Sequence, residues 1–350
     1  MTRLGIIFGG RSGEHDVSLM SAASVINALD KEKFEIVCIG ITKSGKWKRY
    51  NGGVSGIENG EWEKKALPFV VDGLKREIDF AFPALHGPYG EDGTIQGLFE
   101  MLDIPYAGCG VLASALAMDK VAAKEIFSHY RLPVCRYTMI TSEELSGDRE
   151  LLIDKIEMIF LGKYPLFIKP ANMGSSVGIT KTKSRADLIP SLENAAKYDR
   201  RIIIEEGIDA RELETAILGN ASAEAAVVGE ILPSREFYDY HAKYLDDGRS
   251  VINVPADIST DLSEQIRAIA IKAYEALDCA GFARVDFLVD RKTDRIYLSE
   301  INTIPGFTKY SMFPLLWQAA GMSYAGLLER IVDLGYERHH AKNNRQTTLL

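Results

Sequence analysis

Residues 281–308 read GFARVDFLVDRKTDRIYLSEINTIPGFT, two apolar runs that are interrupted by charged and amide side chains. Each run is typical of a buried strand, and the polar DRKTDR between them is typical of a turn. A hairpin centred on the threonine of that turn pairs Asp286 with Glu300 and Arg284 with Asn302. Because side chains alternate between the two faces of a strand, the pattern predicts that these four side chains share one face.

This group of side chains has two interpretations. An ionised side chain that is buried without a partner or a metal costs several kcal/mol, so the pattern requires compensation. Two carboxylates and an amide oxygen are ligands suited to Mg²⁺ that is shared with substrate phosphates. An ordinary salt-bridged sheet face would contain the same residues, and the register alone does not decide between the two.

Composition limits the class of protein. The chain has 350 residues, 46% of them hydrophobic, which is enough for two or three domains with real cores. The net charge of −8 argues against a nucleic-acid binder, and no apolar run approaches the ~20 residues of a membrane helix. The four cysteines (Cys38, Cys109, Cys135 and Cys279) are scattered singly and form no C-x-x-C pair, as expected of buried thiols in a reducing cytoplasm.

The first hundred residues alternate strand and helix patterns. Strands are expected at 4–10, 34–42 and 78–85, with an amphipathic helix at 18–29, which is the rhythm of a parallel βαβ sheet. The polar stretch 44–75 is expected to be an irregular excursion.

After a single helix expected near 112–130, the pattern changes to a small α+β lobe followed by a larger one. Further strands are expected at 166–170, 201–207, 213–219 and 225–231. The tyrosine-rich segment 234–250 lacks periodicity and is interpreted as a functional loop or lid. The tail 337–350, which contains His339 and His340, is expected to be frayed.

Two glycine-rich segments follow strands in the N-terminal part. In GIIFGGRSGEHDVS (5–18) a strand, a glycine-rich bend and a helix start predict an anion-binding arrangement. The spacing is not G-x-G-x-x-G, and no acid follows the second strand, so a dinucleotide fold is disfavoured. Glu14 either interacts with the helix dipole or captures a substrate ammonium. His86, in HGPYGEDGTIQG (86–97), either caps a helix or contacts a ligand.

The segment FIKPANMGSSVGI (167–179) predicts a phosphate-binding loop. A strand delivers Lys169, and the Gly/Ser loop that follows offers N–H and hydroxyl donors, although a plain turn has the same composition and no Walker A motif occurs. Lys120 is a second lysine on an otherwise apolar helix start. Three acids after a very apolar strand suit either a ribose or adenine amine or a solvated strand end: Glu205, Glu206 and Glu212.

Together these stretches resemble the D-alanine–D-alanine ligases of the ATP-grasp superfamily over nearly the whole chain. The resemblance is carried, in chain order, by FGGRSGEHDVSL, ALHGPYGEDGTIQGL, SALAMDK, PLFIKPANMGSSVGI, FYDYHAKY, GFARVDF and EINTIPGFTKYSMFP. It implies an α/β protein with an ATP-grasp fold and an N-terminal parallel-sheet, Rossmann-like domain. The implied units are a substrate-binding domain at 1–115, a small ATP-grasp lobe at 116–210, a C-terminal lobe at 211–338 that includes a lid at 234–250 and the metal site, and a tail at 339–350.

The resemblance also implies the reaction and its residues. ATP and two Mg²⁺ or Mn²⁺ would drive the ligation of two D-alanines through an acyl phosphate, for peptidoglycan precursors. The matched catalytic residues are Glu14, Ser175, Tyr244 of the lid, Arg284 and the N–H of Gly306. The matched substrate-binding residues are Glu14, His86 and Ser311. The matched ATP-binding residues are Lys120, Lys169, Ser176, Glu205, Glu206, Glu212 and Lys243, and the matched metal ligands are Asp286, Glu300 and Asn302.

Other classes fit less well. A Rossmann dehydrogenase needs the G-x-G-x-x-G fingerprint, which is missing here. A regulatory nucleotide-binding module would not need all four polar residues of the hairpin, Arg284, Asp286, Glu300 and Asn302. Tyr244 resembles the dipeptide-forming relatives rather than those that use D-lactate, which tend to carry histidine there, whereas D-serine use is harder to exclude. The resemblance also implies a cytoplasmic homodimer that acts on D-alanine and ATP, with no nucleic-acid or membrane partner.

Overall fold

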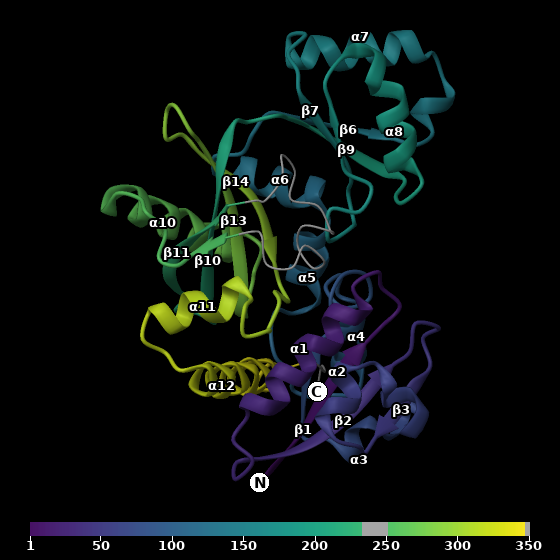
Figure 1. Ribbon diagram of the computed structural model, residues 1–350, viewed down its shortest axis with the longest axis vertical. Helices are drawn as coiled ribbons and strands as arrows, with labels where there is room; N and C mark the ends of the chain where they lie inside the picture. The colour runs from purple at the N-terminus through teal and green to yellow at the C-terminus, as the bar shows by residue number, and fades with distance from the viewer. Residues whose placement is uncertain (233–250, 347–350) are drawn as a thin grey trace.

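The computed structural model describes residues 1–232 and 251–346 and contains three β-sheets (Figure 1). The sheets follow one another along the chain, within residues 2–84, 137–206 and 210–302. Within the described ranges, none of the helices has the length and apolar content needed to span a bilayer. The predicted α/β class is confirmed.

The N-terminal sheet has the strand order β4-β3-β2-β1-β5. Its strands are β1 (Thr2–Gly9), β2 (Phe34–Ile41), β3 (Trp47–Tyr50), β4 (Leu67–Pro68) and β5 (Phe80–Ala84). Strands β1, β2 and β5 are parallel as predicted, whereas β3 and β4 add to the edge in antiparallel orientation. The associated helices are α1 (His15–Ala28), α2 (Val54–Glu58), η1 (Glu61–Lys65), η2 (Val71–Gly73), α3 (Leu74–Glu77) and α4 (Thr94–Met101).

The prediction of an irregular excursion at 44–75 was wrong. This stretch contributes two strands and several short helices, and it is anchored by Trp62, which is 1% exposed. The indole ring lies edge-on to Phe8, at 5.0 Å between ring centroids, and it fills the space beside Gly40 on β2. Buried aromatic surface therefore orders a stretch whose polar composition suggested a loop.

The second sheet, with the order β6-β9-β7-β8, forms the small lobe at the top of Figure 1. Its elements are β6 (Tyr137–Thr141), η3 (Glu144–Ser146), α7 (Arg149–Phe160), β7 (Leu166–Pro170), β8 (Thr180–Thr182), η4 (Arg185–Asp187), α8 (Leu188–Ala196) and β9 (Arg201–Glu206). Helices α7 and α8 share an apolar core with this sheet, and Phe160 and Ile168 are both buried in it.

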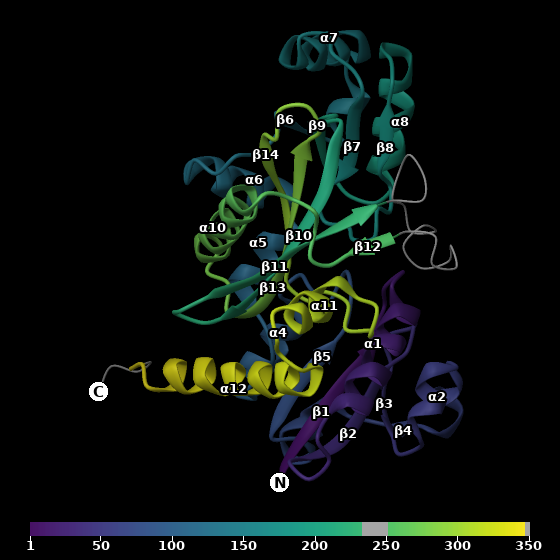
Figure 2. The same cartoon turned by 60° about the vertical axis from the view of Figure 1, so that its left-hand side comes forward.

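The third sheet, with the order β12-β11-β10-β13-β14, is antiparallel throughout. Its elements are β10 (Ala210–Gly219), β11 (Glu224–Leu232), β12 (Val251–Asn253), α10 (Thr260–Ala276), β13 (Gly281–Asp290) and β14 (Ile296–Asn302), followed by α11 (Met312–Ala319) and α12 (Tyr324–Asn343). Figure 2 shows α10 lying along this sheet, and its buried side chains share a core with Val285 and Leu298.

The single helix expected near 112–130 is two helices, α5 (Val111–Met118) and α6 (Lys120–His129). Asp119 separates them, because its carboxylate accepts the N–H groups of Val121 (3.0 Å) and Ala122 (2.9 Å) and thereby caps α6. Most buried apolar side chains of both helices pack into the core of the third sheet, whereas Val121 of α6 packs against Ala171 and Ile203 of the small lobe.

One apolar core joins the N-terminal sheet to the C-terminal part of the chain. Phe82 of β5, Phe282 of β13 and Phe313 of α11 each lie 5.4 Å, between ring centroids, from the fully buried Phe307. Side chains of α12 belong to the same core. Most buried apolar side chains of the small lobe lie in a separate core, and Val121 of α6 packs against Ala171 and Ile203 outside it.

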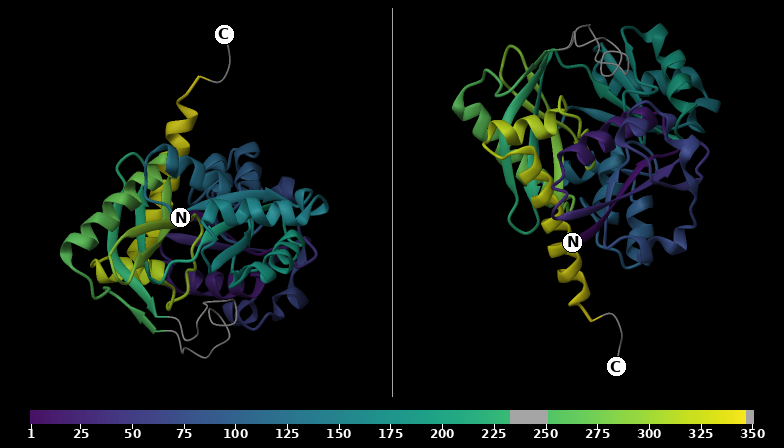
Figure 3. Two further views of the ribbon diagram at one scale, coloured as in Figure 1. Left: turned by 90° about the horizontal axis from the view of Figure 1, so that it is seen from above. Right: turned by 60° about the horizontal axis from the view of Figure 1, so that its bottom comes forward.

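The prediction of a frayed tail at 337–350 was wrong for residues 337–343. Helix α12 continues to Asn343, and in both views of Figure 3 its C-terminal end points away from the rest of the molecule. Polar contacts to α4 and the turn after it hold this end: His339 contacts Asp103 at 3.0 Å, and Lys342 pairs with Glu100.

The cysteines are unpaired thiols, three of them buried and Cys38 half-buried. The spacing of the cysteines in the sequence did not predict that two of them share one buried cluster. Cys109 and Cys279, 170 positions apart in the chain, belong to one buried cluster, where the chain segments around Gly108 and Gly281 lie against each other.

Candidate active site

The register predicted for the 281–308 hairpin is confirmed at the four polar positions. Arg284 pairs with Asn302, and Asp286 pairs with Glu300. Beyond them the register shifts by one residue, with Phe287 opposite Leu298, so Ser299 is the extra residue of a β-bulge. The bulge brings Glu300 and Asn302 onto the face that carries Asp286.

Arg284 holds the centre of this face. Its Nε and Nη2 atoms donate to the two oxygens of Asp286, both at 2.7 Å. Its Nε also lies 2.9 Å from Glu214 Oε2. Burial lowers the pKa of the guanidinium, but the charges of Asp286 and Glu214 outweigh burial and raise the pKa well above its usual range. The arginine is therefore a permanent cation among carboxylates.

Glu214 was missed in the sequence. On β10 it lies opposite Asp286, which lies opposite Glu300, so three carboxylates form a row across three adjacent strands. Glu214 is only 6% exposed. The signal was present in ARELETA (210–216), because the strand alternation that places Glu212 on a face places Glu214 on the same face.

Lys120 links this face to the Gly/Ser loop. Its Nζ donates to the carbonyl oxygen of Met173 at 2.7 Å and lies 3.6 Å from Glu300 Oε2. Asn302 Oδ1 accepts the N–H of Ile304 at 3.1 Å, which fixes the chain as it leaves β14. In the part of the chain that the structure describes, no three His, Cys, Asp or Glu side chains are gathered so as to hold a metal by themselves.

Glu14 and the Gly/Ser loop, far apart in sequence, meet in the structure. The hydroxyl of Ser175 donates to Glu14 Oε1. Both Ser175 (φ +49°) and Ser176 (φ +59°) adopt the left-handed conformation, which is costly for residues other than glycine and is concentrated at functional sites. Two glycines make room for the carboxylate: a Cβ at Gly87 would lie 2.4 Å, and one at Gly174 2.8 Å, from Glu14 Oε2.

His86 is buried, and both of its ring nitrogens contact protein. Nε2 lies 2.8 Å from the hydroxyl oxygen of Ser21, and Nδ1 lies 3.0 Å from the carbonyl oxygen of Ile304. Burial lowers the pKa of the imidazole, so it is neutral near pH 7, donating from Nδ1 and accepting at Nε2. His86 thus ties the end of β5 to the loop after β14, and it is not a helix cap.

Glu91 also faces this region and was not predicted as a site residue, although it lies in the glycine-rich segment 86–97. Its Oε1 accepts the N–H of Gly87 at 2.7 Å. Burial raises the pKa of the Glu91 carboxyl well above its usual range, and the charge of Glu14 raises it further. The carboxyl is thereby held toward its neutral form, which limits the repulsion between the two acids.

A buried ion-pair network lies on the small lobe. Glu205 is 4% exposed, so it is not a solvated strand end. Its Oε1 lies 3.2 Å from Lys124 Nζ, and its Oε2 accepts from Lys169 Nζ at 2.7 Å. Burial raises the pKa of Glu205, but the two ammonium groups outweigh it and lower the pKa to about 2. Lys124 was not singled out in the sequence, because nothing local marks a buried lysine.

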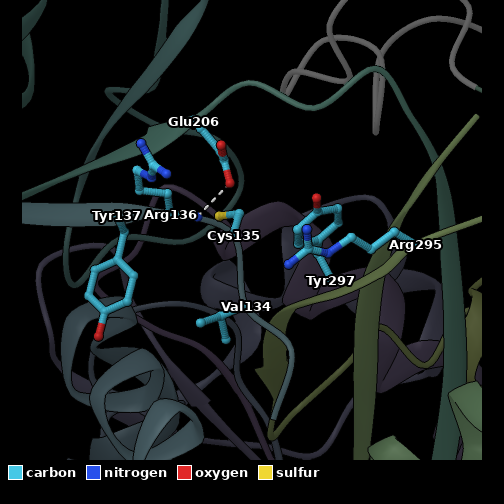
Figure 4. Close-up of a pocket in the computed structure, with 7 residues that line it drawn as sticks. All are labelled: Val134, Cys135, Arg136, Tyr137, Glu206, Arg295 and Tyr297. Atoms are coloured by element: carbon cyan, nitrogen blue, oxygen red, sulfur yellow. Dashed lines mark hydrogen bonds between the residues drawn. The ribbon is translucent and has the colours of Figure 1, made fainter. Parts of the chain in front are cut away.

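A cleft of about 460 Å³ opens between the small lobe and β14 (Figure 4). Glu206 lines it and accepts the N–H of Arg136 at 2.7 Å, with Tyr137 alongside. Across the cleft, the guanidinium of Arg295 lies 5.0 Å from the ring centroid of Tyr297. The cleft therefore has aromatic rings and charges of both signs.

Some of the remaining predicted residues lie in the described part of the chain and some do not. Ser311 begins α11, and its hydroxyl lies 2.8 Å from that of Thr308, while Gly306 lies beside it with no room for a side chain. Glu212, on β10, lies opposite Leu288 of β13. Lys243, Tyr244 and the rest of the predicted lid at 234–250 lie outside the described residues.

Two family models match the chain. The model described as the N-terminus of D-ala D-ala ligase matches residues 3–109, and the model described as the C-terminus of D-ala D-ala ligase matches residues 126–333. Together they cover the three sheets.

Curated relatives match over nearly full length. A D-alanine–D-alanine ligase of Thermoanaerobacter sp. is 52% identical over 355 aligned positions, covering 97% of this chain and 98% of the relative. One of Clostridium acetobutylicum is 48% identical, covering 97% of this chain and 99% of the relative.

Solved structures share the fold. The VanG D-Ala:D-Ser ligase of Enterococcus faecalis superposes with a TM-score of 0.86 at 37% identity, covering 95% of this chain and 99% of that one. The D-alanine–D-alanine ligase of Bacillus anthracis, solved in complex with ATP, superposes with a TM-score of 0.75 at 29% identity, covering 98% of this chain and 100% of that one.

Proposed function

The chain belongs to the D-alanine–D-alanine ligase family, and from this premise we propose that it joins two D-alanine molecules into D-alanyl-D-alanine, with ATP, for peptidoglycan synthesis. The observation that carries the proposal is the contact of Ser175 with Glu14 beside a loop that Lys120 joins to Glu300. An ammonium-binding acid and an acidic, cation-compensated sheet face are thus brought into one site. The ATP complex of the Bacillus anthracis relative supports the choice of nucleotide.

Asp286, Glu300 and Asn302 fit a site for divalent cations. Their oxygens are hard ligands on one sheet face, and that face already needs cations, which Arg284 and Lys120 supply. Two carboxylates and an amide leave coordination positions for nucleotide phosphates. Two Mg²⁺ or Mn²⁺ ions bound there would neutralise charge on the phosphate oxygens and on the leaving ADP.

The other polar residues divide between the substrates. We assign nucleotide binding to Lys120, Lys169 and the Gly/Ser loop with Ser176. We assign Glu205, Glu206 and Glu212 to the adenine and ribose end. Lys243, which is outside the described residues, is assigned to the phosphates. Glu14 takes the ammonium of the first D-alanine, and Ser311 the carboxylate of the second. His86 is assigned to line the binding site of the first D-alanine and to position the 304–307 loop through its contact with Ile304.

In the first step, a carboxylate oxygen of the first D-alanine bonds to the γ-phosphorus while the bond to the ADP oxygen breaks. Both reactants are anions, so cationic side chains must offset their repulsion. We assign this task to Lys120, whose Nζ contacts the loop at the carbonyl oxygen of Met173, and to Lys169, on the strand that leads into the loop. The product is an acyl phosphate.

In the second step, the amine nitrogen of the second D-alanine, having lost a proton, bonds to the carbonyl carbon of the acyl phosphate, and inorganic phosphate leaves. Negative charge develops on the carbonyl oxygen. Arg284 and the N–H of Gly306 are assigned to stabilise it. Tyr244 and the segment 234–250 are assigned to exclude water, since an acyl phosphate hydrolyses readily.

We further propose the three units that the resemblance implies, with one change. Helices α5 and α6 are assigned to the C-terminal lobe because most of their buried apolar side chains share its core. The enzyme is proposed to act in the cytoplasm, where ATP is supplied, and as a homodimer. Light scattering after size exclusion tests the dimer, and a mass of one chain would exclude it.

The function is tested by ATP-dependent phosphate release with product analysis, using D-alanine alone and then with D-serine or D-lactate. D-Alanyl-D-alanine from D-alanine alone is the expected result. No phosphate release with any D-amino acid would overturn the proposal. The likeness to a D-Ala:D-Ser ligase at 37% identity makes D-serine the second candidate acceptor, and a dominant mixed dipeptide would establish it.

A further inference from the structure

Arg284 and a divalent cation require the same oxygens. The guanidinium engages both carboxylate oxygens of Asp286, each at 2.7 Å. Asp286 is a ligand in the proposed function. A cation that coordinates Asp286 must therefore displace part of this bidentate ion pair.

The displaced guanidinium needs another anion. Its side chain is only 17% exposed, and arginine cannot lose its proton in a protein. A buried cation that loses its only partner is strongly disfavoured. The face must contain a second acid if Arg284 is to remain in place while Asp286 is coordinated.

Glu214 satisfies this requirement. Its Oε2 lies 2.9 Å from Arg284 Nε, and its side chain is 8% exposed. It comes from β10, on the far side of β13 from Glu300, so a cation between Asp286 and Glu300 leaves it on the arginine side. Nε donates to Asp286 Oδ1 and also lies 2.9 Å from Glu214 Oε2, whereas Nη2 donates to Asp286 Oδ2. Release of Asp286 therefore frees Nη2, while Nε still has the Glu214 carboxylate beside it.

We propose that Glu214 is a positioning residue that retains Arg284 when a divalent cation takes the Asp286 carboxylate, leaving the Nη2 edge of the guanidinium directed at the reacting carbonyl. This inference rests on the proposed function. Arg284 thus has two arrangements. Without metal it bridges Asp286 and Glu214, and with metal it is held by Glu214.

The first experiment measures Mn²⁺ binding in the presence of the non-hydrolysable nucleotide AMPPNP, from the electron paramagnetic resonance signal of free Mn²⁺. Glu214→Gln is expected to weaken Mn²⁺ binding about fivefold or more, because the guanidinium then depends more strongly on Asp286. The matched control is Glu230→Gln, which removes an equally buried acid of the same sheet from Arg211 (2.7 Å). The control is expected to stay within about twofold of wild type.

Loss of a negative charge by itself also weakens cation binding, so the same substitution is made in an Arg284→Lys background. Lysine keeps the charge but cannot hold both Asp286 oxygens in a planar fork. The effect of Glu214→Gln is expected to shrink to less than about twofold there. An undiminished effect, or an equal effect of Glu230→Gln, would overturn the inference.

A crystal structure of the wild-type protein with Mn²⁺ and AMPPNP provides a test that does not depend on any variant folding. Arg284 is expected to keep its contact with Glu214 and to have released at least one Asp286 oxygen to the metal. An intact bidentate pair beside a bound metal would refute the proposal. Wild-type dipeptide synthesis, measured in parallel, separates failure of this inference from failure of the proposed function.

Discussion

At the scale of single residues, Arg284 is the side chain on which the site depends most. It is buried, always charged, and bonded to both oxygens of Asp286. We expect Arg284→Ala to lower kcat by roughly 10²- to 10³-fold, because one preorganised donor to the developing oxyanion is lost. Phosphate release and dipeptide formation at saturating substrates measure the effect.

The matched control for that prediction is Arg211→Ala, which removes another arginine of the same sheet from a buried carboxylate. Its effect on kcat should be much smaller, although its loss of stability should be similar. A kcat for Arg284→Ala within tenfold of wild type would reject the oxyanion role.

The buried Glu205 should make the stability of the fold depend on pH. Its pKa falls from the ordinary value of 4.5 to about 2, because Lys124 and Lys169 outweigh burial. Between these values the unfolded chain binds a proton that the folded chain does not, so stability falls as pH falls from about 4.5 toward 2 and is fully present above that window. Urea unfolding midpoints at pH 6 and pH 3.5 should therefore differ more for wild type than for Glu205→Gln. Equal differences for the two proteins would contradict the network.

Single residues also show where sequence reasoning stops. Arg284, Asp286 and Glu300 were identified because charges within apolar strands are conspicuous. Glu214 and Lys124 were not, because their importance comes from partners 70 and 81 positions away in the chain. Local composition contains no information about such distant partners.

At the scale of elements, the hairpin β13–β14 shows why its register could be predicted. The turn end of the hairpin pairs Val289 with Ile296, and that register, continued without a bulge, would place Glu300 opposite Val285 on the core face. Burying a carboxylate there would cost several kcal/mol. The bulge at Ser299 avoids this cost. The prediction that the polar side chains share one face was therefore correct, although the sequence did not reveal the bulge itself.

The loop after β5 carries an element-scale prediction. Gly87 has φ +73°, and a Cβ there would lie 2.4 Å from Glu14 Oε2. Gly87→Ala should push the Glu14 carboxylate aside and raise the KM for D-alanine about tenfold or more, since a misplaced binding group costs about 1.4 kcal/mol per factor of ten. Steady-state kinetics at saturating ATP measure the change.

Backbone strain alone would also perturb that loop, so the control must carry the same strain. Gly162 has φ +66°, and a Cβ added there would meet no heavy atom within 4 Å, on a part of the small lobe away from the site. Gly162→Ala should lose comparable stability without changing the KM for D-alanine. Equal KM values for Gly87→Ala and wild type would show that Glu14 does not bind the amino acid.

At the scale of the whole molecule, the cores are not divided as the sequence pattern suggested. The sequence predicted consecutive units, each with its own strands, and three sheets in that order are present. The packing between them was not predictable, because Phe307 in a loop and the helix α12 join the N-terminal sheet to the C-terminal lobe across more than 200 positions. The small lobe has a core of its own, and the N-terminal sheet has a second core on its other face in addition to the shared one.

This arrangement predicts which parts of the molecule unfold together. Phe307→Ala should cost about 3–5 kcal/mol, as for other fully buried phenylalanines, and it should raise amide hydrogen exchange in both β1 and β13 while leaving β9 unchanged. The matched variant Phe160→Ala, in the small-lobe core, should raise exchange in β7 and β9 and leave β1 unchanged. The aromatic cluster around Phe307 supports both the N-terminal and the C-terminal side of the active site. We therefore expect Phe307→Ala to lose dipeptide synthesis at a temperature below the unfolding temperature of Phe160→Ala. Faster exchange confined to β13 and α11 after Phe307→Ala would show that the N-terminal sheet is stable without the cluster, and the shared core would then not be the unit that holds Glu14 against the acidic face.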